Sequence, residues 1–245
     1  MSPLAISFLV FLCVFAGALV GIALRRVLPE HHLSGETKDV IKASIALVGT
    51  MSALVLGLLV GSAKGTYDTQ KDELTSLSAD VTLLERVLRH YGPEAEKARG
   101  LLREAVTDTL AHISEGVGGA TAGQSQAVYD AVLELSPKND LQKSLQSQAQ
   151  SLLQSLGQKR SLMMAQKGSS LSTTLLVVVV FWLAVNFISF GLFAKPNVTA
   201  TAALLVAALS VAGAILLILE MDQPYTGLIR ISDAPLRQAL AQMNN

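Results

Sequence analysis

The stretch ASIALVGTMSALVLGLLVGSAKGTYDTQKDEL, residues 43–74, joins an apolar run directly to a polar segment. Its first part, Ala43–Ala63, carries no charge and is about 20 residues long, which is enough to cross about 30 Å of hydrocarbon as an α-helix. Beyond it, charges begin at Lys64, but no proline interrupts the chain. The stretch therefore predicts a transmembrane helix that continues as a helix outside the bilayer.

Apolar runs of the same kind occur elsewhere in the chain. Hydrophobic residues make up 51% of the sequence and charged residues only 16%, so the chain is more apolar than an ordinary soluble domain. Three further uncharged runs are Leu4–Leu24, Leu171–Ala194 and Val198–Leu219. The first is followed by Arg25-Arg26 and has no basic residue before it, so we expect a retained helix rather than a signal peptide. The sequence predicts an integral membrane protein.

The order of the four runs predicts the fold class, an all-α integral membrane protein with four transmembrane helices in two hairpins. A long polar insert separates the second helix from the third. The predicted parts are a first hairpin at 1–63, a helical extramembrane insert at 64–170, a second hairpin at 171–219 and a C-terminal segment at 220–245.

The insert has the periodicity of helices. Apolar residues recur at helical spacing in its first part, at Leu74, Leu77, Val81, Leu84, Leu88 and Tyr91. Gly92-Pro93 should end this helix, and the glycine-rich stretch near 114–123 should form a flexible tip. After Ser136-Pro137 no proline precedes the third apolar run, so we expect helix and span to be continuous there. Two long helices would then project from the bilayer.

Lysine and arginine near the membrane ends give the orientation. With the insert in the cytoplasm, the cytoplasmic side holds seven basic residues and the opposite side five. The seven are Lys64, Lys71, Lys159, Arg160, Lys167, Arg230 and Arg237, and the five are Arg25, Arg26, Lys38, Lys42 and Lys195. This difference favours a cytoplasmic insert.

Small residues form a stripe on the second span, at Gly49, Ala53, Gly57 and Gly61. Such stripes let helix backbones approach closely. The stripe either packs within one chain, which we favour, or lines a narrow pore in an oligomer, where Leu54 and Leu58 would gate by dewetting. In the third span, Asn186 and Ser189 share a face and would hydrogen-bond a neighbouring helix or, less often, a permeating species.

No residue set in the sequence indicates catalysis or a bound cofactor. The chain has no catalytic serine motif, no zinc-protease motif and no phosphate-binding glycine loop, so we expect no enzymatic activity. His31-His32 lie in a short loop near two glutamates, but a third ligand at a convincing spacing is missing, so we expect no metal site. A net charge of zero argues against nucleic acid as a partner.

The C-terminal segment mixes acids, prolines and arginines in a way that a plain end to a span does not need. We predict a structured collar at the membrane surface, in which acids at the end of the fourth span pair with basic groups. The residues assigned to it are Glu220, Asp222, Pro224, Gly227, Arg230, Pro235 and Arg237. Leu228, Ile229 and Ile231 would bury against the helices, and Ser232 or Asp233 would cap a short final helix that begins near Pro235. The alternatives are a frayed tail, or a ring of Glu220 side chains that selects cations at a pore mouth.

Several pieces of the chain together resemble one family. They are LRRVLPEHHL, LVLGLLVGSAKGTYDTQ, LLERVLRHYGPEA, NFISFGLFAKPN and LSVAGAILLILEMDQPYTGLIRISDAPLRQAL, which begin at residues 24, 54, 83, 186 and 209. The sequence is similar to the bestrophin-like domain family of bacterial membrane proteins. The resemblance implies a bacterial inner-membrane location and a distant relation to bestrophins, which are oligomeric anion channels. The long acidic run with which bestrophins hold calcium is missing here.

Two functions remain open at this stage. The first is an ion-conducting homo-oligomer, because four spans with few polar groups leave one chain little means to enclose a hydrated path. The second is a non-conducting scaffold or signalling protein that presents its insert to a partner. A secondary transporter is disfavoured because no span carries an ionisable residue at mid-depth. Lipid, further copies of the chain and, if it conducts, ions are the expected partners.

Overall fold

A computed structural model describes residues 2–27, 35–114, 122–165, 172–194, 197–223, 225 and 227–243. The regular structure of these residues is entirely helical, which confirms the predicted all-α class. The chain divides into two compact units. We call Met1–Thr66 with Ser170–Asp222 the membrane unit, and Tyr67–Ser169 with Gln223–Asn245 the insert unit.

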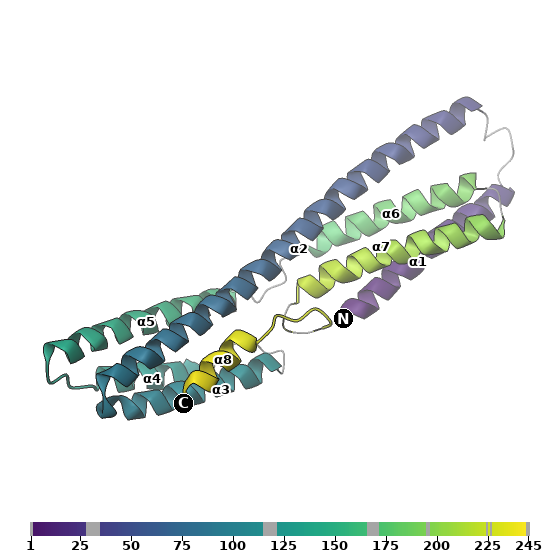
Figure 1. Cartoon of the computed structure of the whole chain (residues 1–245). Helices are drawn as coiled ribbons and strands as arrows, with labels where there is room; N and C mark the ends of the chain where they lie inside the picture. Colours follow the sequence, from purple (N-terminus) through teal and green to yellow (C-terminus); the bar gives the residue numbers. More distant parts are fainter. Residues whose placement is uncertain are drawn as a thin grey trace. The chain divides into compact units, whose positions relative to one another are not determined.

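The membrane unit contains four helices long and apolar enough to cross a bilayer, as predicted. They are α1 (Pro3–Val27), the first part of α2 (Gly35–Tyr91), α6 (Thr173–Phe193) and α7 (Val198–Met221). Figure 1 shows α1, α6 and α7 side by side, and α1 packs against both of the others. Their apolar core includes Val14, Val179 and Ile215.

Glycines bring α1 and α6 into close contact. A Cβ atom added to Gly21 would lie 1.9 Å from the carbonyl oxygen of Ile188, and one added to Gly191 would lie 2.1 Å from that of Ala18. Since real atoms do not approach so closely, only glycine fits at these two positions. The backbones of α1 and α6 therefore contact each other directly, without large side chains between them, as is common between membrane helices.

Two polar side chains on α1 also tie the spans together. Ser7 donates from Oγ to the carbonyl oxygen of Ala212 on α7, at 2.6 Å. Arg25 donates from Nη1 to the carbonyl oxygens of Phe193 and Ala194, at 3.1 and 2.6 Å. A cation at the last carbonyls of a helix satisfies groups that have no partner within the helix. On the same helix, Cys13 is exposed.

Helix α2 is continuous from Gly35 to Tyr91, which confirms that the second span extends into the insert. It ends where predicted. Gly92 has a φ of 118°, in the region that favours glycine, and Pro93 starts the short helix η2 (Pro93–Ala95). Proline has no backbone N–H with which to continue an α-helix.

The insert unit contains the second part of α2 together with α3 (Glu96–Ser114), α4 (Ala122–Leu133), α5 (Asp140–Ala165) and α8 (Ala234–Met243). α4 contacts α3 and α5, and α8 lies along α3 (Figure 1). One core joins residues of all five helices, among them Leu84, Leu102, Val132, Ala149 and Leu236. The insert is therefore a small helical domain with its own core, which is more than the two projecting helices that the sequence predicted.

The expected continuity of the insert with the third span is wrong. Ser172, directly before α6, has an extended backbone with φ −66° and ψ 109°. A residue in this conformation does not continue an α-helix, so α6 begins anew at Thr173. Serine and threonine cluster around this point in the sequence, and their side chains compete with helical hydrogen bonds.

Candidate functional site

The membrane part of α2 exposes most of its surface. In its most apolar 18-residue window, 11% of residues are buried, against 33% in α1 and 28% in α6 and α7. One side of the helix does pack, because Ser52, Leu59 and Ala63 are buried. The opposite side presents Leu54 and Leu58, and Leu58 is 65% exposed. Among the residues that the structure describes, α2 is thus a span with one uncovered apolar face.

The stripe of small residues winds from the packed side of α2 to the exposed side. A step of four residues turns a helix by about 40° beyond a full turn. Gly49 faces α6, where its added Cβ would lie 3.5 Å from Oδ1 of Asn186. Ala53 is exposed, and added Cβ atoms at Gly57 and Gly61 would meet no described atom within 4 Å. Packing within one chain, the interpretation that the sequence favoured, therefore holds only at the Gly49 end of the stripe.

Asn186 and Ser189 make their hydrogen bonds within α6. Asn186 is buried and donates from Nδ2 to the carbonyl oxygen of Trp182, at 2.9 Å. Ser189 donates from Oγ to the carbonyl oxygen of Val185, also at 2.9 Å. These carbonyls are one turn back on the same helix and are always within reach of such side chains. The predicted hydrogen bonds to a neighbouring helix are therefore replaced by local ones.

The residues assigned to the collar fall into both units. Glu220 and Asp222 belong to the membrane unit, where Glu220 is only 2% exposed and Asp222 follows the last turn of α7. Pro224 lies outside the described residues. Gly227 has a φ of 106°, so the chain turns there as predicted.

Two arginines assigned to the collar make local contacts. Arg230 donates from Nε to the carbonyl oxygen of Gly227 at 2.9 Å. Arg237 pairs with Asp233, one turn earlier, at 2.8 Å. The pairing of Arg230 with the acids of α7 stays a prediction.

The end of the chain contributes to the core of the insert unit. Pro235 lies in the first turn of α8, as predicted, and Ser232 Oγ accepts a hydrogen bond from the backbone N–H of Ala234 at 3.3 Å. Ile231 and Leu236 are buried in the insert core. Leu228 is 74% exposed, against the prediction that it buries. Of the three apolar residues that guided the collar prediction, Ile231 thus serves the core of the insert domain.

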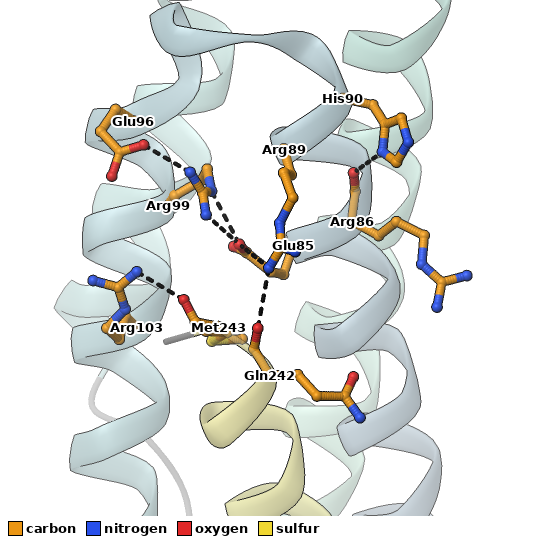
Figure 2. A network of polar contacts seen from close by, with 9 residues as sticks. All are labelled: Glu85, Arg86, Arg89, His90, Glu96, Arg99, Arg103, Gln242 and Met243. Atoms are coloured by element: carbon orange, nitrogen blue, oxygen red, sulfur yellow. Dashed lines mark hydrogen bonds and ion pairs between the residues drawn. The ribbon is translucent and has the colours of Figure 1, made fainter. Parts of the chain in front are cut away.

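A buried carboxylate near the end of α2 organises this part of the insert. Glu85 is 4% exposed, and its Oε1 accepts hydrogen bonds from Nη2 and Nε of Arg99 on α3, at 2.7 and 3.0 Å (Figure 2). Arg89 lies 3.5 Å from the same oxygen. The hydrogen bond to Glu85 raises the pKa of Arg99 above its ordinary value. The pair therefore holds α3 against α2 as two opposite charges.

Arginines of the same cluster hold the end of α8. Arg89 donates from Nη2 to the carbonyl oxygen of Gln242, and Arg103 from Nη2 to that of Met243, both at 3.0 Å (Figure 2). The last carbonyls of a helix need such partners, and cations there also interact favourably with the helix dipole. The cluster therefore links α2 and α3 to the C-terminal helix.

The residues of this cluster are not among those predicted from the sequence to form a site. A signal for it exists, since Glu85 lies among the apolar positions of its helix, between Leu84 and Leu88. The positions of Arg99 and Arg103 gave no such signal, because exposed arginines occur at the same spacing on ordinary helices. Two of the stretches that carry the family resemblance, at 83–95 and 209–240, meet here through Glu85, Arg89 and α8.

The histidine pair that the sequence offers as a metal site, His31-His32, lies outside the described residues. Within the ranges that the structure describes, no group of three histidine, cysteine, aspartate or glutamate side chains gathers around a point that could hold a metal ion.

Comparison with known proteins gives one match. A family model described as a bestrophin-like domain matches residues 12–236, which is most of the chain. No curated protein and no solved structure matches. The matched range includes the larger part of the first span, the other three spans, the insert and the start of α8.

Proposed function

We propose that this chain, which belongs to the bestrophin-like domain family, assembles into a homo-oligomeric ion channel. In the assembly, the exposed face of α2 lies against neighbouring subunits and the conducting path. We place the protein in the bacterial inner membrane with the insert in the cytoplasm, on the basis of the family and of the seven-to-five distribution of basic residues.

The exposed face of α2 is the observation that carries this proposal. Gly17 and Gly21 of α1 and Gly191 of α6 are buried where these two helices meet, while α2 leaves Gly57, Gly61 and Leu58 uncovered. Lipid can cover such a face, but small residues in a span favour contact with another helix. A second copy of the chain supplies that helix and leaves room for a shared path along the axis.

The small number of polar side chains in the spans supports an ion path that several subunits share. The core of α1, α6 and α7 is mainly apolar, and the buried polar side chains described in these helices are Ser7, Asn186 and Glu220. Ser7 and Asn186 donate to carbonyl oxygens of these helices, and Glu220 lies in the last turn of α7. Three polar side chains are too few to line a path for ions through one protomer. Bestrophins, to which the family is distantly similar, are oligomeric anion channels, which supports the same reading.

Conduction is tested with the purified full chain in planar bilayers under a salt gradient. We expect discrete currents whose reversal potential identifies the sign of the permeant ion. A verified oligomer that gives no current across a range of voltages would favour the scaffold function, in which the insert recruits a partner.

Assembly is tested separately with Gly57→Leu. Since no described atom lies near the added side chain, the variant should fold as a single chain but assemble less well. Gly213→Leu on α7 is the matched control, because its added Cβ also meets no described atom within 4 Å. Light scattering in detergent should show a smaller particle for Gly57→Leu only. A monomeric wild-type chain under mild conditions would contradict the proposal.

A further inference from the structure

The insert unit contains a partly open cavity of about 520 Å³. Its wall comes from α2, α3, α4, α5 and the C-terminal segment, and is mainly apolar, with Leu74, Val81, Val106, Val128, Leu156 and Leu236 among its residues. Cavities of about 300–1,000 Å³ with apolar walls and few polar groups are typical of sites for small molecules. The size and lining therefore suit a ligand with a hydrocarbon body.

Arg160 of α5 provides a cation in the cavity wall. Its Nη1 donates to Oγ of Ser125 on α4 at 2.9 Å, which fixes the guanidinium beside the cavity. Its Nε is buried and has no hydrogen-bond partner among the described atoms. In the described part of the chain, no carboxylate pairs with it. The guanidinium thus retains both charge and donor capacity for a ligand.

Tyr225 provides a second donor in the same wall. Its hydroxyl is buried and has no hydrogen-bond partner among the described atoms. Burial, and secondarily the negative charge of Glu73, raises the pKa of Tyr225 to about 12. At neutral pH the hydroxyl is therefore protonated and able to donate.

Two unused donors in a mainly apolar cavity define a ligand class. A buried donor without an acceptor costs free energy, and an acceptor on a ligand recovers it. Arginine has no acceptor atoms, so a cationic head group is excluded beside it. Neutral hydrocarbon would fill the cavity but would leave both donors unsatisfied.

We propose that this cavity binds an amphiphile with a hydrocarbon chain and an anionic head group. The chain lies along the apolar wall, and the head accepts hydrogen bonds from Arg160 and Tyr225. The proposal is independent of ion conduction, because every residue that carries it belongs to the insert unit. Because Tyr225 and Leu236 are part of the wall, an occupied cavity also holds the C-terminal segment in place.

The test uses membrane vesicles that contain the full chain and a palmitic acid with a diazirine in its chain. After illumination, labelled peptides are identified by mass spectrometry. The spans should be labelled because they contact lipid, and they serve as an internal reference. Saturable labelling of the wall segments at 74–81, 102–113 and 153–163 is the result that supports the proposal. Labelling confined to the spans would overturn it.

A charge variant tests the role of Arg160. In Arg160→Gln the palmitic acid probe should label the insert with about tenfold lower apparent affinity, since one charged hydrogen bond is lost. A fatty alcohol with the same diazirine should label wild type and variant alike. Lys143→Gln, which removes an exposed cation from the same helix, is the matched control and should change neither probe. Equal losses for the acid and the alcohol would overturn the assigned role.

A further arm identifies the source of the ligand. Phosphatidylglycerol with the same diazirine in one chain replaces the palmitic acid. If it labels the wall segments, the anionic amphiphile is a lipid of the bilayer. If only the single-chain acid labels them, the ligand is a free fatty acid.

Discussion

Glycines of the membrane unit serve two opposite purposes. Gly21 and Gly191 let α1 and α6 approach until a methyl group would collide with backbone, whereas Gly57 and Gly61 face open space. Gly17 and Gly21 have the same four-residue spacing as Gly57 and Gly61. The spacing alone therefore predicts a stripe, but it does not tell whether the stripe packs within the chain, because that depends on which helix lies opposite.

The variant Gly21→Ala should destabilise the membrane unit. Its Cβ would lie 1.9 Å from a backbone oxygen, so α1 and α6 must separate, at a cost of about 1–3 kcal/mol. The measurement is thermal unfolding of the full chain in detergent, followed by fluorescence of Trp182, the single tryptophan, on α6. Gly213→Ala is the control and should unfold like the wild type. A Gly21→Ala variant as stable as the control would mean that the two helices are further apart than described.

Glu85 shows what residue-level reasoning missed. A charged side chain inside an apolar helical face usually marks a buried partner, and here the partner is Arg99. Removing one member of a buried ion pair costs more than the pair contributes, because the other charge stays buried. The sequence contained the anomaly at Glu85, but the identity of its partner required the turn at Gly92-Pro93 to bring α3 back along α2.

At the scale of elements, the helices and helix ends that depend on local sequence were the most predictable features. Four spans, the uninterrupted α2 and its end at Gly92-Pro93 follow from hydropathy and from the special backbone of glycine and proline. The break at Ser172 did not, since serine is tolerated within helices as well as at their ends. The docking of α8 also did not, because Leu236 and Ile231 have an apolar pattern that fits a membrane surface as well as a protein core.

Helix α8 should contribute directly to the stability of the insert. Leu236 is completely buried, so Leu236→Ala should cost about 2–5 kcal/mol. Since α8 lies along α3, amide hydrogens of both helices should exchange faster in the variant, as measured by mass spectrometry on the full chain.

Leu228→Ala is the matched control for this prediction. Leu228 is exposed, so its truncation should change the free energy of unfolding by less than about 0.5 kcal/mol. Identical exchange of α3 in the two variants would mean that α8 is not part of the insert core.

At the scale of the whole molecule, the apolar side chains of α2 are the proposed gate. If Leu58 lines a narrow path, Leu58→Ser should favour hydration of that path and increase single-channel open time severalfold. The measurement is planar-bilayer recording. Leu209→Ser on α7, where the leucine is 60% exposed, is the matched control and should leave the currents unchanged. Equal effects of both substitutions would place Leu58 against lipid.

The exposed Cys13 makes the stoichiometry of an assembly measurable without engineering. It is the single cysteine of the chain, so a nitroxide attached to it marks each subunit once. In a ring of identical copies, the separations between such marks are the sides and diagonals of a regular polygon. The ratio of the longest to the shortest depends only on how many corners the polygon has. Dipolar spectroscopy on the unmodified sequence would therefore count the subunits by geometry.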